Sequence, residues 1–84
     1  LELFSNDLLI YPNPIKDYFT LSNHLRLPIS DITFFDNLGN ILYVDKNIYS
    51  SPFYFNLSGF QPGTYFIEVI IDNQRIVKKV ILVK

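Results

Sequence analysis

The chain has 84 residues, of which 49% are hydrophobic and 17% aromatic, and its formal net charge is −1. This composition excludes a disordered chain, and the lack of a basic excess argues against nucleic-acid binding. The sequence has no cysteine, which excludes disulfides, thiol catalysis and thiolate metal sites. Its longest apolar runs have four residues, far short of the roughly 18 that a membrane-spanning helix needs.

Short runs rich in β-branched and aromatic residues follow one another along the chain. Turn signals separate them at intervals of about 8 to 12 residues, which is typical of a sandwich or barrel. A helix competes for the last third, yet half of residues 67–84 are Ile or Val, which favour strands. The predicted strands are Leu8–Tyr11, Asp17–Asn23, Ile29–Asp36, Asn40–Asp45, Phe53–Leu57, Thr64–Ile71 and Gln74–Lys84.

The segments between these runs carry recognisable turn chemistry. Pro12-Asn13-Pro14 cannot continue a ladder, so the chain is expected to turn or bulge there. In Asp36–Gly39 we expect a type I turn with Gly39 in the left-handed conformation, and in Asp72-Asn73 a two-residue hairpin. Together these features predict an all-β, Ig-like antiparallel β-sandwich of about seven strands, in which Tyr65 hydrogen-bonds back across a corner.

No catalytic set is visible, so the chain is not expected to be an enzyme, and no cofactor site is predicted. The single histidine, His24, lies in a connection and is interpreted as a surface residue. The carboxylates lie mainly at strand ends and turns, where they bond the local backbone, and their spacing matches no dedicated calcium loop. The aromatic residues around the fifth strand leave a carbohydrate-binding face as an alternative, with Tyr49 and Tyr54 as its candidate residues.

Four motifs occur in a defined order. They are Tyr11-Pro12-Asn13-Pro14 followed by Phe19 and Leu21, Phe34–Gly39, Leu57–Tyr65 and Val77–Val80. In this order, residues 10–84 resemble the C-terminal sorting domain of the type IX (Por) secretion system of Bacteroidetes bacteria, the type A sorting domain family.

The resemblance implies a non-catalytic sorting signal attached to the C-terminal side of a larger cargo protein. The outer-membrane type IX machinery would recognise it after passage through the periplasm, and a sortase-like peptidase would remove it. The cargo would then reach the cell surface or the extracellular space. Residues 1–9 are interpreted as an N-terminal edge or linker with a possible first strand, and residues 10–84 as the sorting domain.

The family's motif residues divide into two groups in this sequence. One group is interpreted as structural, namely Tyr11, Pro12, Asn13, Pro14, Gly39, Gly63 and Tyr65. The other is predicted to be recognised by the secretion machinery, namely Lys78, Lys79, Val80, Ile81, Leu82, Val83 and Lys84.

A physical argument supports the second group. Strand side chains alternate between faces, so Lys78 and Lys79 must point to opposite sides, and one of them faces the core. A charge in such a position protects an edge strand from unspecific pairing with other strands. An edge strand can also accept an added strand from a partner or a second copy. An exposed edge would therefore also allow a homodimer. The rival hypothesis is a fibronectin III-like spacer or adhesion module.

Overall fold

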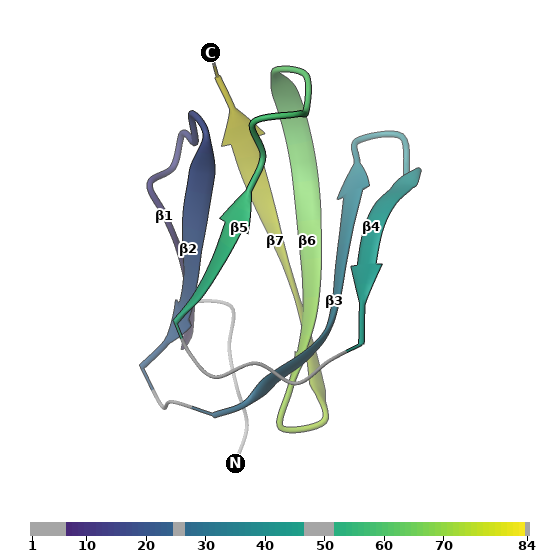
Figure 1. The fold of residues 1–84 in the computed structure, drawn as a ribbon. Coiled ribbons are helices and arrows are strands. Elements are labelled where there is room, and N and C mark those ends of the chain that lie inside the picture. The colour runs from purple at the N-terminus through teal and green to yellow at the C-terminus, as the bar shows by residue number, and fades with distance from the viewer. Residues whose placement is uncertain (1–6, 25–26, 47–51, 84) are drawn as a thin grey trace.

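The computed structural model describes residues 7–24, 27–46 and 52–83, which form seven strands in two facing sheets (Figure 1). The strands are β1 Leu8–Tyr11, β2 Tyr18–Asn23, β3 Ile29–Asp36, β4 Ile41–Asp45, β5 Phe53–Asn56, β6 Gly63–Ile71 and β7 Gln74–Leu82. The first sheet has the order β1-β2-β5, the second the order β4-β3-β6-β7, and all neighbours are antiparallel. This arrangement confirms the predicted seven-stranded, Ig-like sandwich.

The alternation in the sequence explains why the two sheets face each other. In β6, Tyr65, Ile67, Val69 and Ile71 point inward and are buried, whereas the residues between them are only partly buried. The inward residues of the other strands meet them in one core. The buried apolar residues are Leu8, Ile15, Phe19, Leu21, Ile29, Ile32, Phe34, Phe55, Leu57, Tyr65, Ile67, Val69, Ile71, Ile76, Val80 and Leu82.

The third strand departs from simple alternation. Ile29 and Ile32 are both fully buried. They are three positions apart, so in a regular strand their side chains would point to opposite faces. The register with β6 shifts between Ser30 and Thr33, and Asp31 has a φ of 49°. This bulge inserts a residue and lets both isoleucines reach the core. The bulge was not predicted because Asp31 stands alone inside a run of strand-forming residues, without a neighbouring Asn or Gly that would mark a turn.

Two hairpin turns match the sequence prediction. Asp72 and Asn73 have φ values of 51° and 60° and join β6 to β7 with Ile71 opposite Gln74. Gly39 has a φ of 89°, in the left-handed region, and its N–H donates to the Asp36 carbonyl at 3.1 Å. A Cβ at Gly39 would meet no atom within 4 Å, so the backbone angle, not space, requires glycine.

The side chain of Asp36 organises this β3–β4 turn. Its carboxylate accepts hydrogen bonds from the Leu38 N–H and Asn40 N–H, each at 2.9 Å, and from the Asn40 side-chain amide at 3.0 Å. The Asn40 side chain, followed by the backbone bonds, lowers the pKa of Asp36 below its ordinary value of 3.8.

We expect the contribution of Asp36 to stability to disappear in acid. Because the folded-state pKa is lowered, ionised Asp36 stabilises the fold above the unfolded-state pKa, and this contribution is lost as the pH falls through the folded value. Asp36→Ala should therefore destabilise the chain at neutral pH, and its difference from wild type should shrink on acidification. Urea unfolding curves across this range measure the difference, with Asn37→Ala in the same turn as control. A difference that stays constant down to strongly acidic pH would contradict the expectation.

Aromatic rings fill the end of the core near the corner before β6. The Phe34 ring lies 5.4 Å from Phe55, 5.4 Å from Phe60 and 5.1 Å from Tyr65, measured between centroids. The Tyr65 hydroxyl donates to the Gln61 carbonyl, which is the predicted bond across the corner. Tyr65 thus connects the corner to the core and fixes the start of β6, on which β7 is built.

Candidate functional site

The candidate site is β7, which lies at one end of the four-stranded sheet and is therefore an edge strand (Figure 1). Its alternation is regular. Ile76, Val80 and Leu82 are buried, while Lys78, on the same face, is only partly buried. Lys79 is exposed on the opposite face. The prediction that the two lysines point to opposite sides, with one toward the core, is confirmed.

The C-terminal end of β7 is joined to the first sheet. The Ile15 N–H donates to the Ile81 carbonyl at 2.8 Å, and the Val83 N–H donates to the Ile15 carbonyl at 2.7 Å. Ile15 pairs in parallel with Leu82 and is itself fully buried. Figure 1 shows the end of β7 beside the connection between β1 and β2. The final residues of the strand are therefore held between β6 and the Ile15 segment.

These two bonds also define the direction of the other backbone groups of β7. Ile81 and Val83 turn their N–H and C=O groups away from β6, and the register with β6 has no shift. Every second residue must do the same, so the N–H and C=O groups of Arg75, Val77 and Lys79 also point outward. Among the described residues, no strand pairs with these outward groups. The middle of β7 is an open edge.

The side chains of the outward residues lie on the outer face of the four-stranded sheet. Val77 and Ile81 are exposed there, and Arg75 donates from Nε to Glu68 Oε2 at 2.7 Å. Arg75 is largely solvent-exposed although Glu68 is partly buried, so the pair contributes little to stability. The open edge thus presents a mixture of apolar and cationic side chains.

The apolar surface continues from β7 across the sheet. Lys79 is the Cα partner of Phe66, which pairs with Phe35, which in turn pairs with Ile41. The Phe35 and Phe66 rings are stacked with centroids 5.8 Å apart. Ile41 and Val44 at the far end are exposed. A partly exposed apolar stripe therefore leads from the open edge to β4.

The other predicted site residues lie away from this edge. Pro12, Asn13 and Pro14 follow β1 and lead into Ile15, so the motif positions the residue that closes the end of β7. Gly63 begins β6 with a φ of 154°. Tyr11 is half-exposed at the end of β1. Lys84, the last predicted recognition residue, lies outside the described residues.

The residues considered for other chemistry are also placed. His24 is exposed, and its Nε2 lies 3.4 Å from Asp7 Oδ1. In the described part of the chain, no group of three or more His, Cys, Asp or Glu residues could hold a metal ion. Tyr54 is exposed on β5, whereas Tyr49 lies outside the described residues. In the same ranges, no helix is long and apolar enough to cross a membrane.

A comparison with protein families matches residues 9–84 to the family described as secretion system C-terminal sorting domain. The chain belongs to this family. No curated protein and no solved structure matches the chain. The match covers the whole sandwich, including β1 from Leu9 onward and all of β7. It favours the sorting hypothesis over a fibronectin III-like spacer, which shares the sandwich architecture.

Membership makes this sandwich a C-terminal sorting signal of the type IX secretion system. Such signals belong to proteins that are exported to the cell surface or the extracellular space. The predicted boundary between residues 9 and 10 falls inside β1, which runs from Leu8 to Tyr11. The role of residues 1–9 as a linker stays a prediction, since residues 1–6 lie outside the described residues.

Sequence reasoning missed one important part of the site, the Ile15 bridge. The available signal was weak, namely one apolar residue between Pro14 and Lys16. A bridge of this kind joins positions that are far apart in the chain. Periodicity within a single run therefore could not reveal it.

Proposed function

We propose that the secretion machinery at the outer membrane recognises this domain by binding to the open edge of β7. The open part of this edge consists of Arg75, Val77 and Lys79. It leads into the rest of the proposed recognition segment, Lys78–Lys84, where Ile81 and Val83 are bonded to Ile15. The observation that carries the proposal is that the outward N–H and C=O groups of Arg75, Val77 and Lys79 have no strand partner among the described residues. A strand or hairpin of a partner would add to this edge and pair with those groups.

The two lysines have separate roles in this mechanism. Lys79 lies on the outer face beside the exposed Val77 and Ile81, where it would contact the partner. Lys78 lies opposite the fully buried Ile67 and carries its charge on the core face. A charge in that position disfavours unspecific stacking of further strands and sheets on this edge. The edge is thereby protected against unspecific pairing and stays accessible to a specific partner.

Family membership supports the following proposal for the finer steps of the route. The cargo is attached before residue 1, residues 1–9 act as the linker, and the protein passes through the periplasm. A sortase-like peptidase then removes the domain near the linker. The domain itself performs no catalysis. A second copy of this chain is the other partner that an open β7 edge would accept, and such a homodimer would occupy the edge before recognition.

We expect a periplasmic reporter fused before this chain to leave a host cell that has the type IX machinery. The reporter carries a signal peptide, and its amount is measured in periplasm, outer membrane and medium. The controls are the same reporter without the chain and the fusion in a host that lacks the machinery, and both should stay periplasmic. The mass of the exported reporter shows whether the domain was removed. Retention of the fusion in the periplasm of the competent host would contradict the proposal.

A further inference from the structure

The outer face of the three-stranded sheet, on the side of the molecule away from β6, carries three exposed tyrosines. Tyr11 and Tyr54 are the Cα partners of Thr20 from the two sides, so the three residues form one row across the sheet. Tyr18 lies two residues before Thr20 and therefore on the same face. The tyrosines are 49%, 65% and 59% exposed in that order, yet Thr20 is only 8% exposed. The rings around Thr20 must shield it.

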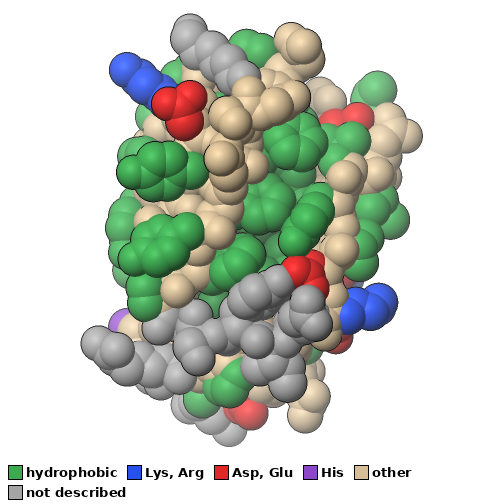
Figure 2. Space-filling model, viewed as in Figure 1, with side chains coloured by type: hydrophobic (Ala, Val, Ile, Leu, Met, Phe, Trp, Pro, Cys, Tyr) green, Lys and Arg blue, Asp and Glu red, His purple; other side chains and the backbone are tan. Residues whose placement is uncertain are grey.

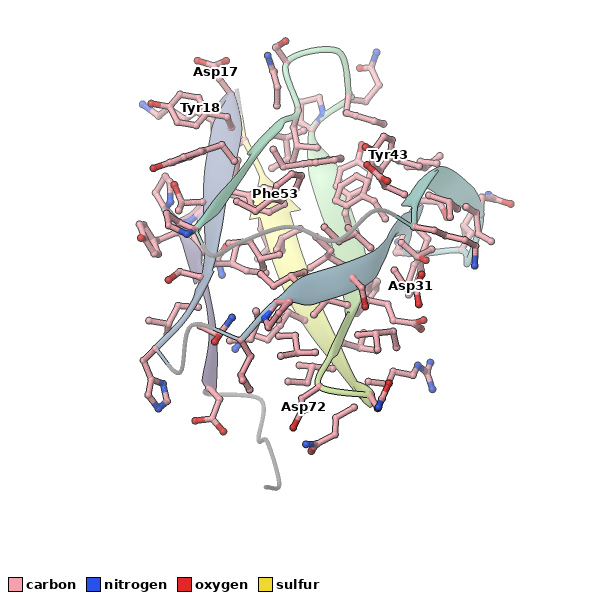
Figure 3. All side chains as sticks on the ribbon, turned by 60° about the horizontal axis from the view of Figure 1, so that its bottom comes forward. Asp17, Tyr18, Asp31, Tyr43, Phe53 and Asp72 are labelled. Atoms are coloured by element: carbon pink, nitrogen blue, oxygen red, sulfur yellow. The ribbon has the colours of Figure 1, made fainter. Side chains whose placement is uncertain are left out.

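Two shallow depressions flank Tyr18 on this face. One has a volume of about 280 Å³ and is lined by Pro12, Pro14, Lys16, Asp17 and Tyr18. The other has a volume of about 380 Å³ and is lined by Tyr18, Tyr54, Phe55 and Asn56. Figure 3 shows Tyr18 beside Asp17 at the outer side of β2, whereas Phe53 points between the sheets. In Figure 2, large hydrophobic side chains stand exposed on the left, where β2 and β5 lie in Figure 1.

Polar groups surround these rings and have no protein partner among the described residues. They are the three tyrosine hydroxyls, the Lys16 ammonium, the Asp17 carboxylate and the Asn56 amide nitrogen. The orientation of the Asn56 amide is fixed, because its Oδ1 accepts the Ser58 N–H at 2.8 Å. The amide donor is therefore held in place beside Tyr18 and Tyr54. The face combines flat aromatic surface with preorganised hydrogen-bonding groups.

We propose that this tyrosine face is a binding site for a neutral oligosaccharide. The C–H groups on one face of a hexose ring carry a small positive charge on their hydrogens. This charge is attracted to the negative face of a tyrosine ring. Tyr18 stands between the two depressions, so adjacent sugar units would lie on its two sides. The hydroxyls of the sugar would bond to the amide of Asn56 and to the tyrosine hydroxyls. Lys16 and Asp17 cancel in charge, which fits a neutral ligand.

A protein partner fits this face less well. An apolar surface placed over the tyrosines would bury their hydroxyls and the Asn56 amide without partners, and each such group is costly to desolvate. An added peptide strand would pair with an open strand edge and would leave the face of the sheet free. A carbohydrate supplies both the C–H surface and the many hydroxyls that the face requires. The proposal does not depend on how the secretion machinery reads β7.

Titration of the ¹⁵N-labelled chain with cellohexaose, maltohexaose and mannohexaose, followed by amide chemical shifts, tests this site. We expect at least one sugar to shift the amides of Thr20, Tyr54 and Asn56 at millimolar concentration and to leave the outer face of the other sheet unmoved. Tyr18→Ala should weaken this binding at least about fivefold, as for other central contact residues. Tyr18→Phe keeps the ring and should bind nearly as wild type, and Val44→Ala on the other sheet is the matched control.

Three results would overturn the proposal. The first is the absence of shifts on the tyrosine face with all three sugars. The second is binding that Tyr18→Ala and Val44→Ala affect equally. The third is that the same amides shift only with a synthetic peptide of residues 75–84, which would make the face a docking surface for a strand of another copy. Because Tyr18 is more than half exposed, its replacement leaves the core intact, and the amide spectrum of each variant verifies the fold.

Discussion

Replacing Lys79 by proline should abolish type IX export of a fused reporter while the sandwich stays folded. The Lys79 N–H points away from β6, so proline removes an outward donor and none of the bonds between β6 and β7. The proline ring would also obstruct a strand that approaches the edge. Fractionation of cells that express the fusion measures export, and urea unfolding of the isolated chain measures stability. We expect a change of roughly 1 kcal/mol or less in the free energy of unfolding.

Two further variants separate the possible causes. Lys79→Ala removes the charge but keeps the N–H, so it should retain export if the backbone edge is what the machinery reads. Val77→Pro blocks the next outward N–H and should behave as Lys79→Pro. Normal export of both proline variants, each shown to be folded, would reject strand addition at this edge. If Lys79→Ala also loses export, the machinery recognises the ammonium group of Lys79 and not only the backbone of the edge.

These point substitutions are sharper than a truncation of the terminal strand. Removing residues 80–84 would delete Val80 and Leu82 from the core, and with them the bond from the Val83 N–H to Ile15. The four-stranded sheet would lose the anchored end of β7 and the domain would be destabilised. A loss of export after truncation would then report on folding as much as on recognition. Because edge and core residues alternate along β7, they must be tested residue by residue.

Much of the fold followed from patterns that are local in the sequence. The period-2 alternation of the last strand predicted that Lys78 and Lys79 point to opposite sides with one of them toward the core, and the structure shows that this is Lys78. Asp72-Asn73 and Gly39 marked their turns because these residues tolerate positive φ. In each case the deciding interaction lies within a few residues. The sheet to which each strand belongs was not predicted, since strand order depends on contacts between distant segments.

Only part of the candidate site could be predicted, because its other part also depends on contacts between distant segments. The sequence identified the β7 residues and the lysine pair, but it could not show which part of the strand is open. That depends on Ile15, which pairs with the end of β7 from the connection between β1 and β2. The bulge at Asp31 was not predicted either, because Ile29–Asp36 was expected to be a single strand and its register depends on pairing with the distant β6. Of the tyrosine face the sequence suggested only Tyr54, because its three tyrosines come from three different strands.

The second large effect is expected at Phe34, whose ring touches three other aromatic rings in the core. Phe34→Ala should lower the free energy of unfolding by about 3–5 kcal/mol, because it removes buried surface and leaves a cavity. Phe35→Ala is the matched control on the adjacent, outward position. It loses the stacking with Phe66 and should cost only about 1 kcal/mol. Urea unfolding of the two variants measures both values, and equal losses would mean that the faces of β3 are assigned wrongly.

The same pair of variants distinguishes recognition of a folded edge from recognition of a linear segment. Small domains are stable by about 5–15 kcal/mol, so Phe34→Ala leaves a substantial unfolded fraction if this sandwich lies at the low end. β7 has a fixed edge only while it is paired with β6, and the sequence of residues 74–84 is unchanged in the variant. Export should therefore fall in Phe34→Ala and persist in Phe35→Ala. Full export of an unfolded Phe34→Ala fusion would show that the machinery reads the terminal segment as an extended peptide.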